Sequence, residues 1–219
     1  MATPKKIPVG TPGISSPRKA TSTVSPCGPV SIPQKAFQDA KPFQTFQVAF
    51  IGRTGSGRNS LAWRMKNLND SELPTLSFLP RREIILETST RPALRHQGII
   101  ELQIRIVPPE DLHGQPFFDR NGGINECDVI VFVVDLGDER SSNEFYTLYR
   151  KAQRHSRRGL PPFLIVGNKV DLRLLGVVTP HRWGENTANL YSARAYLECS
   201  AKTNDRVGDV LDAILRILL

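Results

Sequence analysis

The chain has 219 residues and a formal net charge of +8, a length that suits one domain with its own core and leaves little room for a second. Its three cysteines, Cys27, Cys127 and Cys199, fit neither a disulfide framework nor a zinc site, so reduced thiols are expected. The absence of a secretory leader and of any run of eighteen apolar residues predicts a protein that is neither secreted nor transmembrane.

The positive charge is concentrated in the first 44 residues, where six Lys and Arg face one Asp and eight of the seventeen prolines occur. Such a Pro/Ser/Thr-rich segment has too few large aliphatic residues to offset the entropy lost on ordering. We therefore predict a disordered basic tail at 1–44 and a folded domain at 45–219. The tail could attract phosphates, acidic protein surfaces or anionic lipid, but a solvated tail is the commoner case, and no nucleic-acid partner is expected.

Apolar runs and helical patterns alternate along the rest of the chain. Strands are predicted at 46–52, 99–107, 129–135, 162–167 and 195–197, and helices at 60–68, 142–156, 180–194 and 207–218. Strands that alternate with helices require right-handed crossovers, so the pattern predicts an α/β fold with a doubly wound, mostly parallel sheet. In such sheets ligands bind beyond the carboxyl ends of the strands, so functional residues are expected there.

A glycine-rich loop follows the first predicted strand and precedes a helix, which is the context of a phosphate-binding P-loop. Arg58 replaces the usual lysine that reaches the terminal phosphates, and Asn59 replaces the hydroxyl residue that binds Mg²⁺. Asn59 offers only a neutral amide oxygen, so magnesium should be weakly held. A glycine-rich turn without a ligand is the alternative. The candidate nucleotide-binding residues of this loop are Gly52, Thr54, Gly55, Ser56, Gly57, Arg58, Asn59 and Ser60.

The sequence Asn168-Lys169-Val170-Asp171 ends another apolar strand and suits recognition of guanine. The Asp171 carboxylate can accept hydrogen bonds from the ring N–H and the exocyclic amine of guanine, a pair of donors that adenine lacks. Lys169 would lie along the base, and Asn168 would tie this loop to the P-loop. A surface turn of the same four residues is the alternative.

The third motif, Glu198-Cys199-Ser200-Ala201-Lys202-Thr203, follows the last predicted strand and precedes the last helix. The backbone N–H of Ala201 could contact the base carbonyl, and Lys202 would flank the ring. Ser200 is included with them among the candidate nucleotide-binding residues.

The motifs Gly-x-x-x-x-Gly, Asn-Lys-x-Asp and Ser-Ala-Lys, in this order and each after a strand, resemble the Ras superfamily of small GTPases. The run Glu-Cys-Ser-Ala-Lys-Thr looks especially Rho- or Rab-like. The resemblance covers residues 46–219 and implies a P-loop NTPase fold with a six-stranded sheet flanked by helices. The interval between Asp171 and Ser200 is too short for the helical insert of most Rho members, so no subfamily is assigned.

Two weaker elements resemble the switches of that family. Thr75 matches the first-switch threonine that contacts Mg²⁺, and the run from Asp111 to Gln115 resembles the second switch. The resemblance implies a water-mediated contact from Asp111 to Mg²⁺, a γ-phosphate contact from the Gly114 N–H, and a catalytic Gln115 that orients the attacking water. The second run is displaced from its usual spacing, and a plain loop is the alternative.

These features predict a guanine-nucleotide-binding molecular switch with GTP or GDP and weakly held Mg²⁺ as cofactors. Thr54 stands where fast family members have glycine and would crowd Gln115, so the chain is at most a slow GTPase that forms GDP and phosphate. The alternative is a pseudo-GTPase, a protein-interaction module with weak or no nucleotide cycling. A P-loop kinase is disfavoured by Asn168 and Asp171.

The resemblance also implies protein effectors or regulators as partners, and a monomer or a subunit of a heteromeric complex. No cysteine stands near the C-terminus and no glycine follows Met1, so no lipid anchor is expected. We expect a signalling protein of the cytoplasm, with the cytoskeleton and the nucleus as alternative locations.

Overall fold

The computed structural model describes residues 44–70, 72–74, 83–89, 99–107, 123–175 and 179–219. The predicted tail lies outside these residues except for Gln44, which already opens the first strand. The predicted Thr75, Asp111, Gly114 and Gln115 also lie outside them.

The described residues form a six-stranded sheet in the order β2-β3-β1-β4-β5-β6. The parallel pairs are β1–β3, β1–β4, β4–β5 and β5–β6, so the predicted doubly wound, mostly parallel α/β fold is confirmed. The strands that pair in parallel are β1 (Gln44–Gly52), β3 (Ile99–Ile106), β4 (Val129–Asp135), β5 (Phe163–Asn168) and β6 (Ala195–Glu198).

The remaining strand, β2 (Glu83–Ser89), pairs antiparallel with β3 at the edge of the sheet. No strand was predicted from its own sequence. Ile84 and Leu86 are buried, whereas Ile85 between them is 47 % exposed. This alternation is typical of a strand with one face on the core and the other in water.

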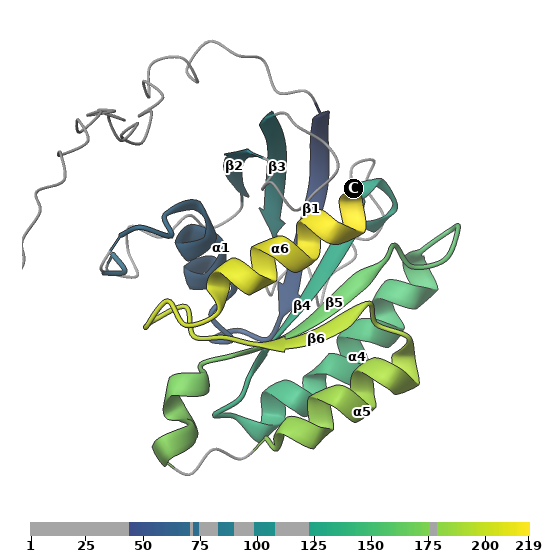
Figure 1. The fold of residues 1–219 in the computed structure, drawn as a ribbon. Coiled ribbons are helices and arrows are strands. Elements are labelled where there is room, and N and C mark those ends of the chain that lie inside the picture. Colours follow the sequence, from purple (N-terminus) through teal and green to yellow (C-terminus); the bar gives the residue numbers. More distant parts are fainter. Residues whose placement is uncertain (1–43, 71, 75–82, 90–98, 108–122, 176–178) are drawn as a thin grey trace, which may run out of the picture. The chain divides into compact units, whose positions relative to one another are not determined.

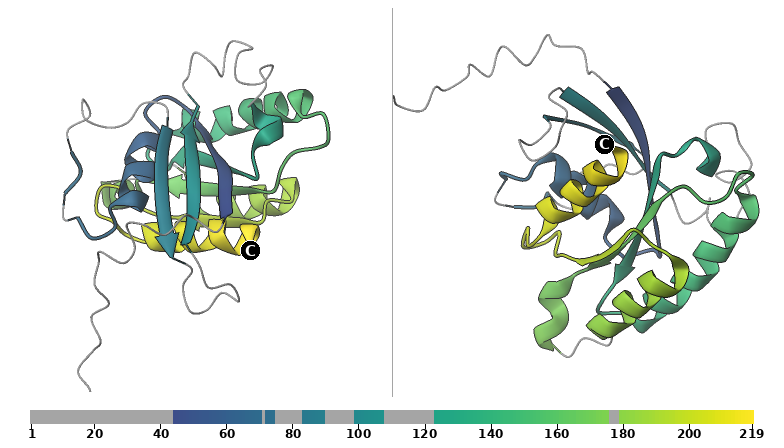
Figure 2. Two further views of the ribbon diagram at one scale, coloured as in Figure 1. Left: turned by 90° about the horizontal axis from the view of Figure 1, so that it is seen from above. Right: turned by 45° about the vertical axis from the view of Figure 1, so that its right-hand side comes forward.

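Helices cover both faces of the sheet (Figures 1 and 2). On one face lie α1 (Arg58–Lys66) and α6 (Val207–Leu218), and on the other lie α4 (Glu139–His155) and α5 (His181–Tyr191). Successive side chains of β1 pack on opposite faces of the sheet. Val48 and Phe50 belong to the core cluster on one face, and Ala49 and Ile51 belong to the cluster on the other. Within the part of the chain described, none of the helices combines the length and apolar character of a membrane span.

Local capping explains where the helices begin and end. Helix α1 starts two residues earlier than predicted, because Gly57 takes the left-handed conformation that the turn into the helix requires. Helix α4 starts at Glu139, because the Asp138 side chain accepts a hydrogen bond from the Arg140 N–H. Helix α5 stops at Tyr191, because Ser192 adopts a φ of 56°.

The carboxyl ends of four parallel strands meet at one edge of the sheet. These ends are Gly52 of β1, Asp135 of β4, Asn168 of β5 and Glu198 of β6. The short helix η4 (Val170–Leu175) continues directly from β5. All three sequence motifs therefore lie at the edge where parallel sheets bind their ligands.

Candidate nucleotide-binding site

The glycine-rich loop between β1 and α1 has the backbone form of an anion-binding turn. Gly55 and Gly57 both have a φ of 85°, in the left-handed region that favours glycine. Helix α1 begins without a side-chain cap and without an acidic residue in its first turn. Its first N–H groups and the positive end of its dipole therefore face the loop, an arrangement that stabilises phosphate. Thr54 is exposed and Ser60 half-buried.

The second glycine of the loop is also required by packing. A Cβ atom at Gly57 would overlap the side-chain amide of Asn168. Only glycine allows this close approach, because every other residue carries that atom. The phosphate loop and the end of β5 therefore fit together through Gly57.

Asn168 joins the three predicted loops. Its Nδ2 donates to the Ser56 carbonyl at 2.9 Å, and its Oδ1 accepts from the Ala201 N–H at 3.0 Å. Asn168 is only 1 % exposed, so both bonds are shielded from water. The Ala201 N–H that was expected to contact the base carbonyl thus donates to Asn168 in this structure.

The Asp171 carboxylate lies in η4, where Ser200 fixes it. Ser200 Oγ donates to Asp171 Oδ1 at 2.6 Å, and the Thr203 N–H donates to Ser200 Oγ at 3.1 Å. The Ser200 hydroxyl thereby connects the Asn-Lys-x-Asp loop to the Ser-Ala-Lys loop. A carboxylate held in one orientation is the group needed to accept two parallel donors from a base.

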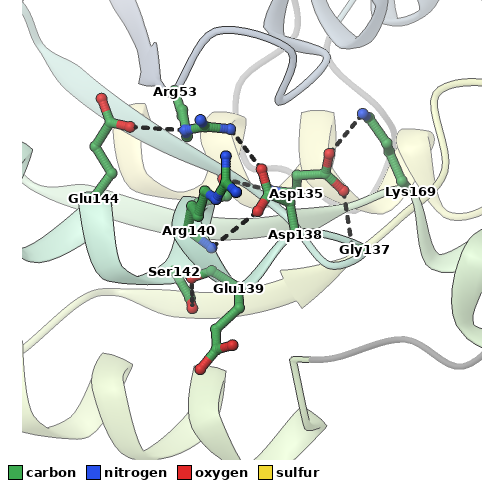
Figure 3. A network of polar contacts seen from close by, with 10 residues as sticks. Arg53, Asp135, Gly137, Asp138, Glu139, Arg140, Ser142, Glu144 and Lys169 are labelled. Carbon is green, nitrogen blue, oxygen red and sulfur yellow. Dashed lines mark hydrogen bonds and ion pairs between the residues drawn. The ribbon is translucent and has the colours of Figure 1, made fainter.

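Lys169 is anchored by a residue that the sequence analysis did not single out. Its φ is 67°, and its Nζ forms an ion pair of 2.6 Å with Asp135 Oδ2 at the end of β4 (Figure 3). The other oxygen of Asp135 accepts from the Gly137 N–H at 2.9 Å. The sequence could have indicated Asp135, because this carboxylate stands at the end of a predicted strand, as the candidate residues do. This pair fixes the Lys169 side chain in place.

Arg53, inside the phosphate loop, fixes that loop to the start of α4. Its Nη1 lies 2.5 Å from Asp138 Oδ2, and its Nε lies 3.1 Å from Glu144 Oε2 (Figure 3). All three side chains keep between 23 and 32 % of their surface exposed. Each pair therefore contributes only about 0.2–1 kcal/mol, and its main effect is to restrict the loop.

Arg58 donates a hydrogen bond from its guanidinium to a backbone carbonyl. It is 5 % exposed, and its Nη1 donates to the Val107 carbonyl just beyond β3. Val107 is fully buried, and its N–H donates to the Phe50 carbonyl at 3.1 Å. A guanidinium has more donors and a longer reach than an ammonium, so it can satisfy a buried carbonyl that a lysine would miss.

The residues that the structure describes do not form a fitting Mg²⁺ site. Asn59, in the first turn of α1, supplies an amide where magnesium prefers a hydroxyl or carboxylate oxygen. Among the described residues no group of three His, Cys, Asp or Glu could hold a metal. Of the three predicted metal ligands, Asn59 is the one that lies among the described residues, and its amide is a weak ligand for magnesium.

A buried carboxylate, Glu198, connects η4, β6 and the start of α5. Arg173 donates to its two oxygens at 2.7 and 2.5 Å, and the Tyr196 hydroxyl donates at 2.7 Å. His181 Nδ1, at the start of α5, lies 2.9 Å from the same carboxylate. Burial alone would raise the pKa of Glu198, but hydrogen bonds from Arg173, His181 and Tyr196 outweigh it and lower the pKa to about 2. This cluster ties η4, and with it Asp171, to β6.

The comparisons with known proteins agree with this architecture. Residues 101–219 match the family model described as the Ras family. The chain is also 25 % identical over 201 residues to the human Rho-related GTP-binding protein RhoD, an alignment that covers 85 % of this chain and 89 % of that protein. The order of the strands, the glycine-rich loop and the match over more than half of the sequence lead to one conclusion. The chain belongs to the Ras family of small GTPases.

Proposed function

We propose that this protein is a guanine-nucleotide-binding switch that hydrolyses GTP slowly. The proposal assigns the base to Asn168, Lys169, Asp171 and the Ser200–Lys202 loop, and the phosphates to the Gly52–Ser60 loop. GTP or GDP would be the ligand, with Mg²⁺ held weakly. The proposal also assigns Gln115 to orienting the attacking water, and Asp111 and Thr75 to the metal.

The observation that carries this proposal is the Asn168 junction. One buried side chain bonds the phosphate loop at Ser56 and the Ser-Ala-Lys loop at Ala201. The Asp171 carboxylate is fixed beside it by Ser200. A plain surface turn would need neither a buried junction nor a fixed carboxylate. The pattern supports a preorganised site for a base with two adjacent donors.

A second candidate function is a pseudo-GTPase that acts as a protein-interaction module. It is favoured by the Arg58 guanidinium, which donates to the Val107 carbonyl, and by the amide at Asn59. Both residues alter the phosphate side and leave the base side unchanged. Under this reading the protein binds nucleotide weakly or permanently and does not cycle.

The first prediction is guanine selectivity with little dependence on metal. Because Asp171 reads the base while Asn59 binds Mg²⁺ poorly, GDP should bind at least about tenfold more tightly than ADP, and EDTA should change the GDP affinity by less than about threefold. Titration of fluorescent GDP and ADP with and without EDTA measures both ratios. Equal affinity for the two nucleotides, or no binding of either, would contradict the proposed function.

The second prediction concerns the altered phosphate loop. The double substitution Arg58→Lys with Asn59→Ser restores a compact charge and a hydroxyl ligand, so Mg²⁺-dependent GTP binding should strengthen by about tenfold. Isothermal titration of both proteins in Mg²⁺ and in EDTA measures the change. A gain that persists in EDTA would argue against restored metal binding. No gain at all would mean that these two residues do not limit the site.

We further propose that protein effectors or regulators are the partners, and that the chain is a monomer or a subunit of a heteromeric complex. The proposed location is the cytoplasm, with the cytoskeleton or nucleus as alternatives. Residues 1–44 are proposed as a basic tail to the domain formed by residues 45–219.

A further inference from the structure

One arginine of α1 is buried without serving any function assigned above. Arg64 has no exposed surface, although arginine is among the residue types least often fully buried. No carboxylate among the described residues pairs with it, and its Nη2 has no hydrogen-bond partner there. A buried charge with this environment contributes little to stability compared with an apolar residue of similar volume. Its position therefore points to a role other than stability.

The two nitrogens of Arg64 that have partners both donate to backbone carbonyls. Nη1 donates to the Asp70 carbonyl at 2.6 Å, in the turn after α1. Nε donates to the Ala201 carbonyl at 3.0 Å, in the Ser-Ala-Lys loop. The guanidinium thus connects the phosphate-loop helix to the base-binding loop across 137 residues of sequence.

Both backbone polar groups of Ala201 are therefore hydrogen-bonded. Its N–H donates to Asn168 Oδ1, and its carbonyl accepts from Arg64 Nε. A residue bonded at both sides cannot turn its backbone without breaking one of the bonds. Donation to the Ala201 carbonyl also polarises the peptide that it shares with Lys202, which makes the Lys202 N–H a stronger donor.

We propose that Arg64 is a positioning residue for base recognition, which sets the backbone of the Ala201–Lys202 loop that reads the C6 carbonyl of guanine. The inference rests on the proposed function, because it assumes that guanine occupies the corner formed by Asp171 and Ser200. Two groups of the protein would then recognise two different parts of the base. Asp171 reads the N1 and C2 donors, and the loop held by Arg64 reads position 6.

The test replaces Arg64 by methionine, which fills a similar volume without donors. Three diphosphates serve as probes: GDP, inosine diphosphate, which lacks the C2 amine, and 6-thio-GDP, in which sulfur replaces the C6 oxygen as a weaker acceptor. Arg64→Met should lower the affinity for GDP about tenfold and reduce the preference for GDP over 6-thio-GDP by a similar factor. The preference for GDP over inosine diphosphate should stay within about twofold, because Asp171 is untouched.

Asn204→Gly is the matched control. Asn204 Nδ2 donates to the Leu68 carbonyl at 2.7 Å, so it joins the same two segments without touching Ala201. Glycine accepts the φ of 61° found at this position. This variant should leave both base preferences unchanged. Thermal unfolding of each variant shows whether it is folded, and Arg64→Lys, which keeps the charge but lacks the two-carbonyl reach, replaces Arg64→Met if that protein does not fold.

The outcomes separate this inference from the proposed function. If the wild-type protein does not prefer GDP to ADP, the proposed function fails and this inference fails with it. If the wild type is selective but the folded Arg64 variant keeps its preference for GDP over 6-thio-GDP, the inference alone is overturned. A fall in both base preferences together would assign Arg64 a general structural role and would equally overturn it.

Discussion

Replacing Asn168 by alanine should abolish guanine-nucleotide binding and destabilise the fold. The change removes the donor to the Ser56 carbonyl and the acceptor for the Ala201 N–H, both in a buried position. Each backbone group left without a partner costs about 1–3 kcal/mol. The free energy of unfolding should therefore fall by about 2–6 kcal/mol, and the affinity for GDP by at least about 100-fold. Urea unfolding and fluorescent GDP titration measure the two effects.

Asn125→Ala provides the control for this change. Asn125 also bridges two backbone groups, because its Nδ2 donates to the His155 carbonyl and its Oδ1 accepts from the Arg157 N–H. It is exposed, so water can replace both bonds. Its removal should cost less than about 1 kcal/mol and leave GDP binding unchanged. If Asn168→Ala bound GDP as the wild type does, the junction of the three loops would not be a nucleotide site.

Most of the fold could be predicted from the sequence because the buried strands are short, continuous apolar runs bounded by polar motifs. The strands 129–135 and 99–107 were predicted to within one residue of β4 and β3. The edge strand β2 could not be predicted in the same way. Its aliphatic run is only Ile84 to Leu86, and its pairing with β3 depends on a contact between separate parts of the chain.

Contacts of the candidate site could be predicted where they follow from the position of a motif at the end of a strand. They could not be predicted where a side chain bonds a backbone group far away in the sequence. Asn168 stands at the end of β5, so its place beside the glycine-rich loop follows from the parallel sheet. The substitution at Arg58 was visible in the sequence, but its donation to the Val107 carbonyl was not. The contact of Arg64 with the Ala201 carbonyl likewise joins residues 137 positions apart, and no local pattern predicts it.

The site is therefore uneven in its chemistry. On the base side, Asn168, Ser200 and Glu198 are each bonded to two or more groups, which fixes the loops around Asp171. On the phosphate side, the backbone of an anion-binding turn is present, and one donor of the Arg58 guanidinium is bonded to the Val107 carbonyl. Under the proposed function, such a site should bind the base selectively, while the altered phosphate side limits the rate of hydrolysis.

The final prediction concerns stability and its dependence on pH. Glu198→Gln removes a carboxylate whose side chain is only 5 % exposed and whose pKa is lowered from 4.5 to about 2. A carboxyl with a lowered pKa in the folded state stabilises the protein fully above its unfolded value, near pH 4.5, and loses that contribution as the pH falls toward 2. The shift corresponds to about 3 kcal/mol at neutral pH. Urea unfolding of both proteins at pH 7 and between pH 2 and 5 measures this difference.

Glu185→Gln is the matched control, because Glu185 contacts the same His181 at 3.4 Å but keeps 57 % of its side chain exposed. It removes the same charge and should cost no more than about 0.5 kcal/mol, since exposed ion pairs are weakened by solvent. The Glu198 variant should therefore differ from the wild type strongly at pH 7 and hardly at pH 2, whereas the Glu185 variant differs little throughout. Equal losses in the two variants, or a Glu198 effect that persists unchanged at pH 2, would mean that the lowered pKa of Glu198 does not stabilise the fold.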